Sequence, residues 1–344
     1  MKKFILRTII FLLPILILHL YNSKIKYENI GDLTRIGNIR FDNKFTKTLL
    51  FKESKIKIKY IDYTKSSLNE SFSILTIGDS FNNQNEFGYN NYLAQDPNYK
   101  VLHYNGVLKN NNQIQTLIGM INGNIFESNK IKYVLLENIE RQIIDNIKSI
   151  DFNYKINRNE IINFHKNNDL KKNKIDLFPK NTAIKITLNS FKYFISNQSI
   201  FNKKVYKVAL TDNFFSVQDS TLLFYFYDLA STKINNNINN IVYLNKILND
   251  IEYKLSKKGV KLIYLPCSDK YDFYYNYIKN NNTLDKPMFF DLFRTLKHNF
   301  FVIDSKYILT KEIKRQKDLY FYEDTHWSPN ATKLIANEIS KIIL

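Results

Sequence analysis

Short apolar segments recur along the chain from residue 71 onward, each bounded by polar or turn-forming residues. Runs of this kind indicate strands that are buried on both faces of a sheet. The predicted strands are SILTI (73–77), YKVLHY (99–104), KYVLLEN (132–138), VKLIYLP (260–266) and NFFVID (299–304). Because segments with helical character lie between them, they predict a parallel sheet that helices cover on both faces.

The intervening segments predict the covering helices. In INNIVYLNKILNDIEYKLSKKG (238–259) apolar residues recur at spacings of three and four, and Gly259 fits the position just past the helix end. Ser328 suits the N-cap of a final helix and Pro329 its first turn. Further helices are expected at 87–95, 112–121 and 287–297. The pattern predicts an α/β fold, a flavodoxin-like three-layer sandwich with its active loops at the carboxyl ends of the strands.

Two stretches lack this alternation of predicted strands and helices. Residues 22–70 are polar and irregular, and we interpret them as a stalk followed by a leading strand at 55–61. Residues 142–225 are rich in Lys and Asn, and we interpret them as a large, partly helical insertion that could cap the site or simply be a solvated excursion. We interpret residues 71–344, which include this insertion, as a single catalytic domain.

The N-terminus predicts a membrane anchor. Lys2, Lys3 and Arg7 precede an apolar stretch that runs from Thr8 to Leu20, and no small-residue cleavage site follows it. We therefore expect an uncleaved signal anchor over 1–21, a transmembrane helix with its N-terminus inside. The rest of the chain would then lie outside the cytoplasm.

The composition narrows the classes of partner. The formal net charge is +18, but the basic residues are dispersed and no nucleic-acid motif is present, so we expect no nucleic-acid partner. The charge could favour an anionic glycan or lipid surface, or reflect a bias in the coding DNA. Cys267 is the single cysteine, which excludes an intrachain disulfide and a cysteine metal cluster.

Ser80, in GDSFNNQ after the first predicted strand, is a candidate nucleophile. Gly78 would allow a sharp turn that exposes the hydroxyl, although Gly, Asp and Ser also form ordinary turns. Serine needs a base, and of five histidines His326 in FYEDTHWSPNA lies in the loop before the final helix. Asp324 can orient its imidazole. The alternative is a helix-capping loop with a solvated histidine.

Acyl transfer also requires donors for the developing oxyanion. The backbone N–H of Ser80 is one expected donor. Gly106 follows the second predicted strand and could present another N–H group, and Asn138 ends the third strand and could supply a side-chain amide.

Four further residues are candidates for substrate binding. Arg141 could hold an anionic group or pair with Glu137. Lys270 and Tyr271 follow the fourth predicted strand and could line the cleft, and Trp327 could wall the site. The aromatic residues could equally belong to the core.

Together these motifs resemble the SGNH (GDSL-type) hydrolase superfamily: GDS, Asn-Gly, Asn and D-T-H-W follow one another in the expected places over 71–141 and 226–344. The D-T-H-W block is similar to the SGNH-like domains of alginate and peptidoglycan O-acetyltransferases, which are membrane-anchored and face the periplasm. The resemblance implies an SGNH hydrolase fold with Ser80 as nucleophile, His326 as base and Asp324 as its orienting acid. It gives the oxyanion-hole roles to Gly106 and Asn138, although LLENIER replaces the family's Gly-x-Asn-Asp block.

The resemblance implies a membrane-anchored O-acyltransferase, in particular an O-acetyltransferase, that modifies a cell-envelope polysaccharide through an acyl-serine intermediate. The expected location is the bacterial inner membrane, with the catalytic domain in the periplasm. The acyl donor could be a membrane-bound O-acyltransferase, and no cofactor or metal is expected. A carbohydrate esterase with the same Ser-His-Asp site and a non-enzymatic SGNH-like module of envelope polymer assembly are the alternatives.

Overall fold

A computed structural model describes residues 2–23, 31–37, 50–65, 70–104, 112–126, 130–163, 204–217 and 220–343. In this part of the chain a six-stranded sheet has the order β1-β3-β2-β4-β7-β8. All of its neighbouring strands are parallel. The strands are β1 (Ile61–Asp62), β2 (Ile74–Ile77), β3 (Val101–Tyr104), β4 (Tyr133–Ile139), β7 (Lys261–Cys267) and β8 (Phe301–Val302).

The sheet confirms the predicted α/β class with a central parallel sheet. The five strands expected after residue 71 are all present, and they lie in the order second, first, third, fourth, fifth, which is the flavodoxin-like arrangement. The leading strand expected at 55–61 forms only at its end, where β1 pairs with β3. From β2 the chain first adds β3 on one side and then adds β4, β7 and β8 on the other side. The carboxyl end of β2 is therefore the topological switch point, where ligands bind in such folds.

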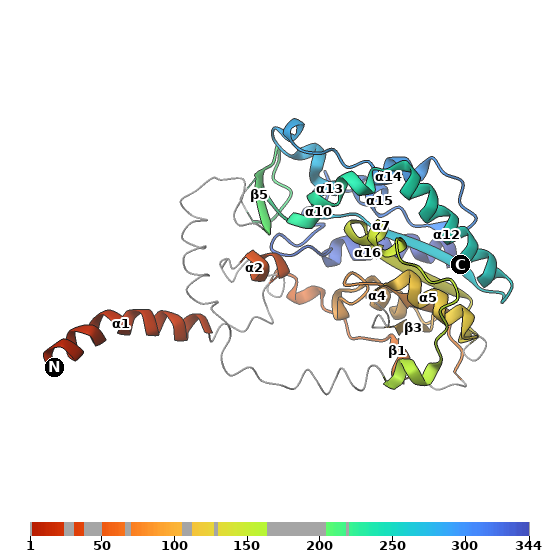
Figure 1. Cartoon of the computed structure of the whole chain (residues 1–344), viewed down its shortest axis with the longest axis horizontal. Coiled ribbons are helices and arrows are strands. Elements are labelled where there is room, and N and C mark those ends of the chain that lie inside the picture. Colours follow the sequence, from red (N-terminus) through yellow and green to blue (C-terminus); the bar gives the residue numbers. More distant parts are fainter. Residues whose placement is uncertain are drawn as a thin grey trace.

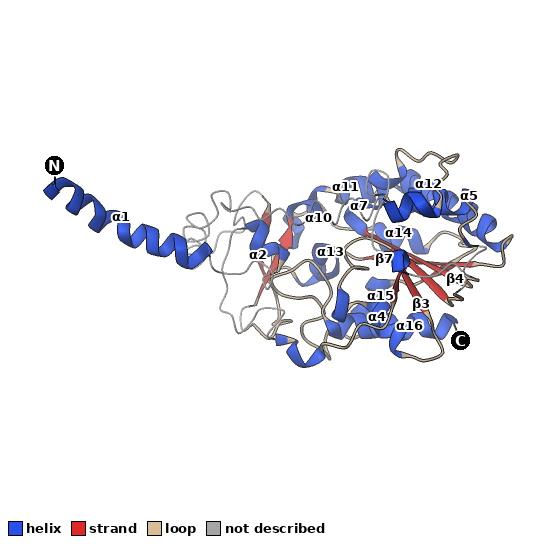
Figure 2. Ribbon diagram, turned by 90° about the horizontal axis from the view of Figure 1, so that it is seen from below, coloured by secondary structure: helices blue, strands red, loops and turns tan. Residues whose placement is uncertain are grey.

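Helices cover both faces of the sheet, as Figure 2 shows. One face carries α4 (Tyr89–Gln95), α15 (Ser305–Thr310) and α16 (Pro329–Ile343). The other face carries α5 (Gln113–Asn122), α7 (Glu140–Ile147), α12 (Ile238–Ser256) and α14 (Phe289–Arg294). Three layers therefore enclose two apolar cores, as the hydrophobic pattern predicted.

Alternate strand residues supply the two cores. Leu135 of β4 belongs to the core that includes Ile335 of α16, whereas its neighbour Leu136 belongs to the core that includes Leu248 of α12. A strand with a buried residue on each side of the pleat has no polar face, which explains the nearly unbroken apolar runs.

Shorter elements lie at the carboxyl end of the sheet. They are α2 (Asp32–Gly37), α10 (Phe226–Ala230), α11 (Thr232–Asn235) and α13 (Lys270–Tyr274), together with the antiparallel hairpin β5 (Val205–Ala209) and β6 (Thr221–Tyr225). The hairpin packs against α2 (Figure 1). Within the described residues the predicted insertion contains most of α7, a helical segment at 158–163 and the hairpin. Residues 164–203 lie outside the described residues.

The predicted anchor and stalk differ from the structure. The N-terminal segment forms α1 (Lys2–Ser23), with Pro14 inside it. Within the described residues we find no helix whose length and apolarity would let it cross a membrane, so the expectation of a transmembrane helix is not supported. In the predicted stalk, Leu33 of α2 is fully buried and Phe51 packs edge-on against Phe321, so these parts contact the α/β domain.

Candidate active site

The GDS turn begins directly after β2, at the switch point of the sheet. Ser80 is exposed, whereas Gly78 is buried. A Cβ atom at Gly78 would lie 2.3 Å from Glu137 Oε2 and 2.7 Å from Asn82 Cβ. Glycine is needed here because no side chain fits between the turn and Glu137.

Two acidic side chains, Glu137 and Asp79, fix this turn to the end of β4. Glu137 Oε2 accepts hydrogen bonds from the backbone N–H groups of Asp79 (2.8 Å) and Asn82 (3.2 Å). In return Asp79 Oδ2 accepts the N–H of Ile139 (2.7 Å) and its Oδ1 accepts the N–H of Phe81 (3.2 Å). Burial, and then the charge of Asp79, raise the pKa of Glu137 well above its ordinary value. The backbone on both sides of Ser80 is therefore held in place.

The second motif lies in a closed loop before α16. Tyr320 and Trp327 form an antiparallel bridge, and the N–H of Phe321 donates to the carbonyl of His326 (3.1 Å). Inside the loop Asp324 Oδ1 accepts the N–H of His326 (3.0 Å) and is also hydrogen-bonded to His326 Nδ1. Because Nδ1 donates to the carboxylate, the neutral imidazole carries its lone pair on Nε2, as a general base for serine requires.

Phe81 joins the two motifs. Its ring lies 4.9 Å from the ring of His326 and 4.8 Å, edge to face, from that of Trp327 (centroid distances). On the solvent side of these contacts Ser80 and His326 line one pocket of about 200 Å³, together with Asn83, Gln84, Asn85, Phe87 and Phe321. The predicted nucleophile Ser80 and the predicted base His326 thus line the same pocket, although they are far apart in the sequence.

Sequence reasoning missed Asp32. It is the first residue of α2, its Oδ1 accepts the N–H of Thr325 (2.7 Å), and its Oδ2 lies 3.7 Å from His326 Nδ1. Its own N–H donates to Asp324 Oδ2 (3.3 Å). Burial, and then the neighbouring Asp324, raise the pKa of Asp32. The histidine therefore lies beside two carboxylates.

A signal for Asp32 was present in the sequence. In a chain with eight glycines, Gly31-Asp32 repeats the Gly-Asp pair of Gly78-Asp79. Gly31 is also required for space, since a Cβ there would lie 2.2 Å from the carbonyl oxygen of Glu323. The N–H groups of Leu33 and Thr34, at the start of α2, donate to the same carbonyl (3.1 and 3.3 Å), which attaches α2 to the histidine loop.

Asp32, Asp324 and His326 could also be considered as metal ligands, since one ligand atom of each lies within 4.8 Å of the others. The same atoms already hydrogen-bond within the cluster: His326 Nδ1 with Asp324, and both Asp32 oxygens with Thr325. An ion would have to replace these bonds. The hydrogen-bonded arrangement is the one a serine hydrolase uses to orient its base.

Of the two other predicted oxyanion donors, the structure describes only Asn138, and it is not found in the pocket. Asn138 is fully buried in β4, and its Nδ2 donates to Gln113 Oε1 at the start of α5 (3.1 Å). Its side chain therefore joins the sheet to a helix, and it is not among the residues that line the pocket. Gly106 lies outside the described residues.

The candidates for substrate binding have internal partners instead. Arg141 is bound to Asp269 (2.8 Å) and Asp228 (3.2 Å). Lys270 is fully buried, and its Nζ donates to the carbonyls of Phe321 (2.8 Å), Tyr322 (2.7 Å) and Asp324 (3.2 Å). Because its ammonium group is hydrogen-bonded to these three carbonyls, Lys270 stabilises the loop that carries Asp324 and His326 and is not available to bind a ligand.

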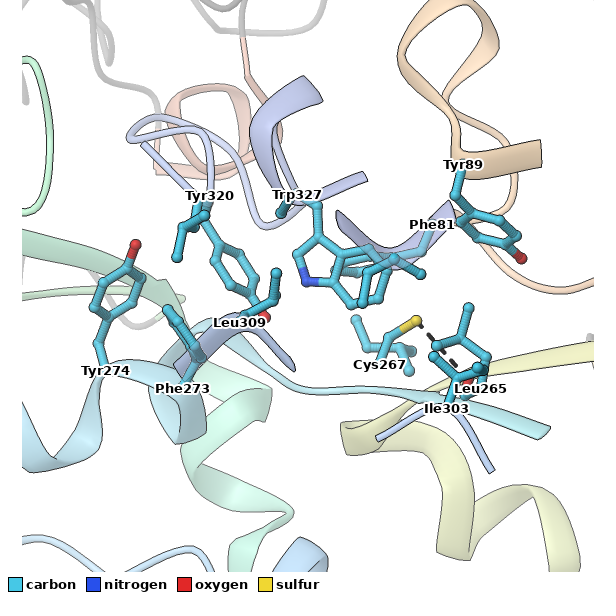
Figure 3. Close-up of a cluster of buried hydrophobic side chains, with 14 of the residues drawn as sticks. Phe81, Tyr89, Leu265, Cys267, Phe273, Tyr274, Ile303, Leu309, Tyr320 and Trp327 are labelled. Atoms are coloured by element: carbon cyan, nitrogen blue, oxygen red, sulfur yellow. Dashed lines mark hydrogen bonds between the residues drawn. The ribbon is translucent and has the colours of Figure 1, made fainter. Parts of the chain in front are cut away.

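The two aromatic candidates belong to the core. Tyr271 is fully buried and donates to the carbonyl of Asp285 (2.6 Å). Trp327 is also fully buried, and Figure 3 shows its indole among Phe81, Tyr320 and Leu309. Trp327 therefore supports the ring that packs on His326 and does not wall the pocket, which corrects the prediction for both residues.

Residues 225–344 match the family model of the SGNH hydrolase-like domain of the acetyltransferase AlgX. The predicted resemblance is confirmed for this region, which contains Asp324 and His326, whereas Ser80 precedes it. No curated protein and no solved structure matches the chain. The match supports an SGNH-type, acetyl-modifying role.

Proposed function

We propose that this protein is a serine-dependent O-acetyltransferase that modifies a cell-envelope polysaccharide. The observation that carries the proposal is the shared pocket, in which exposed Ser80 lies with His326 while Asp324 is hydrogen-bonded to Nδ1 of the imidazole. The similarity of residues 225–344 to an acetyltransferase domain supports acetyl as the group transferred.

The reaction follows from these positions. His326 Nε2 takes the proton of Ser80 as Oγ attacks the carbonyl carbon of an acetyl ester, and the carbonyl electron pair moves onto oxygen. When the tetrahedral intermediate collapses, the ester C–O bond breaks, the leaving alkoxide receives the proton from His326, and acetyl-serine remains. A sugar hydroxyl then attacks the acetyl carbon while His326 takes its proton. The bond from the acetyl carbon to Ser80 Oγ breaks, His326 returns the proton to Oγ, and the new ester is formed.

Transfer requires that a sugar hydroxyl reach the acetyl-serine in preference to water. Water is present at about 55 M, so a bound and oriented acceptor must supply a comparable effective molarity. The net charge of +18 supports an anionic polysaccharide acceptor. We propose that the acetyl donor is supplied by a membrane-bound O-acyltransferase.

The same proposal includes an extracytoplasmic location. Lys2, Lys3 and Arg7 ahead of the apolar segment support it, because positive charge before an apolar run is typical of export signals. A reporter that is active only outside the cytoplasm should be active when it is fused to the C-terminus, and recovery of the whole chain from the cytosol with an inactive reporter would contradict this location.

The test of function is the ester-linked acetate of the envelope polysaccharides. Deletion of the gene should lower it, wild-type protein should restore it, and Ser80→Ala should not. Ser256→Ala, which changes an exposed serine at the end of α12, is the matched control and should restore acetate fully. An increase of acetate on deletion would instead indicate an esterase, and no change in any polymer would favour a non-enzymatic module.

A further inference from the structure

One buried donor in the pocket has no use within the described structure. Gln84 lines the same pocket as Ser80 and His326. Its Nε2 atom is buried and has no hydrogen-bond partner among the described residues. A buried donor without a partner costs about 1–3 kcal/mol, so such groups in native proteins call for an explanation, and a ligand is one.

The neighbouring amide of the pocket is already engaged. Asn83 Nδ2 donates to the carbonyl of Asp79 (2.9 Å), and its Oδ1 accepts from His103 Nε2 (3.0 Å). His103 can donate through Nε2 because Nδ1 accepts from Asn90 (3.0 Å), and burial lowers the pKa of His103 to about 4, so that it remains neutral. Asn83 is therefore a fixed part of the turn, whereas Gln84 has a donor to offer.

Backbone hydrogen bonds fix the segment that joins Ser80 to Gln84. The N–H of Asn83 donates to the carbonyl of Ser80 (3.3 Å), which closes the turn, and the N–H of Phe87 donates to the carbonyl of Gln84 (3.1 Å). A short helical turn, Asn85–Phe87, follows directly. The amide thus lies on a positioned segment, as a preorganised donor must.

We propose that Gln84 Nε2 donates a hydrogen bond to the acetyl carbonyl oxygen as that oxygen becomes negatively charged. This inference rests on the proposed function. It gives Gln84 the role of side-chain oxyanion donor that was predicted for Asn138. The bond strengthens when Ser80 Oγ attacks and the carbonyl electron pair moves onto oxygen, and it weakens when the intermediate collapses to acetyl-serine. Gln84 then contributes to the transition state more than to binding of the ester.

The experiment measures kcat/KM for 4-nitrophenyl acetate with the purified full-length protein. Gln84→Ala should lower kcat/KM about 100-fold to 1000-fold, mainly through kcat, as loss of one oxyanion donor does elsewhere. Gln142→Ala, which removes an exposed glutamine from α7, is the matched control and should leave the rate unchanged. Thermal unfolding of Gln84→Ala and Gln84→Met verifies that the variants are folded.

Gln84→Glu distinguishes a donor from a merely structural residue. A carboxylate only accepts hydrogen bonds and repels the oxyanion, whereas its protonated form can donate. The activity of Gln84→Glu relative to wild type should therefore rise as pH falls from about 8 to about 5, toward the ordinary pKa of glutamate. A structural defect would give a constant ratio.

The outcomes separate this inference from the proposed function. If Ser80→Ala is inactive while Gln84→Ala stays within about twofold of wild type, the oxyanion role is wrong and the serine mechanism stands. A strong loss in Gln84→Ala with a pH-independent ratio in Gln84→Glu also overturns the oxyanion role. If Ser80→Ala is as active as wild type, the proposed function itself fails.

Discussion

At the scale of single residues, the unusual feature of this site is a second carboxylate beside the histidine. Asp32 Oδ2 lies 3.7 Å from His326 Nδ1, on the nitrogen that Asp324 already engages. A charge at this distance is worth up to about 4 kcal/mol where the effective dielectric constant is near 20. Asp32 should therefore stabilise the positive charge that His326 acquires when it takes the serine proton.

Asp32→Asn keeps an acceptor for the N–H of Thr325 but removes this charge. We expect kcat/KM to fall about 10-fold to 100-fold, less than the roughly 10,000-fold loss that removal of the orienting acid produces elsewhere. Because the pKa of Asp32 is raised, the wild-type protein should lose this contribution as the pH falls, and the variant should be less sensitive to acid. A kcat/KM equal to that of wild type at all pH values would assign Asp32 to structure alone.

At the scale of elements, Lys270 at the start of α13 supports the loop that carries Asp324 and His326. Burial lowers the pKa of Lys270 to about 7, yet its Nζ is the donor for three loop carbonyls. Lys270→Met should leave those carbonyls unsatisfied and lower the free energy of unfolding by about 3–5 kcal/mol, with a loss of activity. Denaturant unfolding measures the change.

The control for this variant is Lys314→Met, at an exposed lysine. It should change the free energy of unfolding by no more than about 0.5 kcal/mol. Equal stability of Lys270→Met and Lys314→Met would show that the loop does not depend on the buried ammonium group.

The elements also show what the sequence could and could not predict. Apolar runs predicted the strands, since burial on both faces leaves a local pattern. The flavodoxin-like arrangement was predicted from the alternation of these strands with helices. The turn with Ser80 and the loop with His326 could be predicted from local sequence. Ser80 directly follows the first predicted strand, and His326 lies in the loop before the final helix, so both were expected at the same edge of the sheet. Asp32 was missed because its partners Asp324 and Thr325 lie 292 and 293 positions away. The Gly31-Asp32 pair marks the residue locally, but it does not indicate which distant loop the residue contacts.

The partners of the charged residues could not be predicted for a related reason. Lys270 was a candidate for the cleft because it follows the fourth predicted strand, and Arg141 was a candidate either for holding an anionic group or for pairing with Glu137. Whether they are buried depends on partners such as Asp269, which tertiary folding alone brings near. The Asn138 amide was likewise given to the pocket, whereas its position on β4 directs it to Gln113.

At the scale of the whole molecule, the buried carboxyl of Glu137 links stability to pH. Its pKa is raised well above the ordinary 4.5, so the folded protein retains a proton that the unfolded chain releases. The contribution of protonated Glu137 to the free energy of unfolding of the wild-type protein is therefore fully present below about pH 4.5. It is lost as the pH rises toward the pKa of Glu137 in the folded protein.

Glu137→Gln keeps an uncharged side chain of the same shape and removes this titration. The free energy of unfolding of the variant minus that of wild type should therefore increase with pH above about 5, by at most about 1.4 kcal/mol per unit. Thermal melts of both proteins between about pH 4 and 8 measure it. Other titrating groups, Lys270 included, are common to both proteins, so a difference that does not change with pH would contradict the protonated state of Glu137.

The central claim is that Ser80 carries the acetyl group, and mass spectrometry of the acyl-enzyme tests it most directly. The protein is mixed with 4-nitrophenyl acetate, quenched in acid and digested. The expected result is one added acetyl group on the peptide that contains Ser80, formed far more slowly in His326→Ala and absent from Ser80→Ala. Acetylation of Ser80→Ala at the wild-type rate, or of the wild-type protein only at other residues, would contradict it.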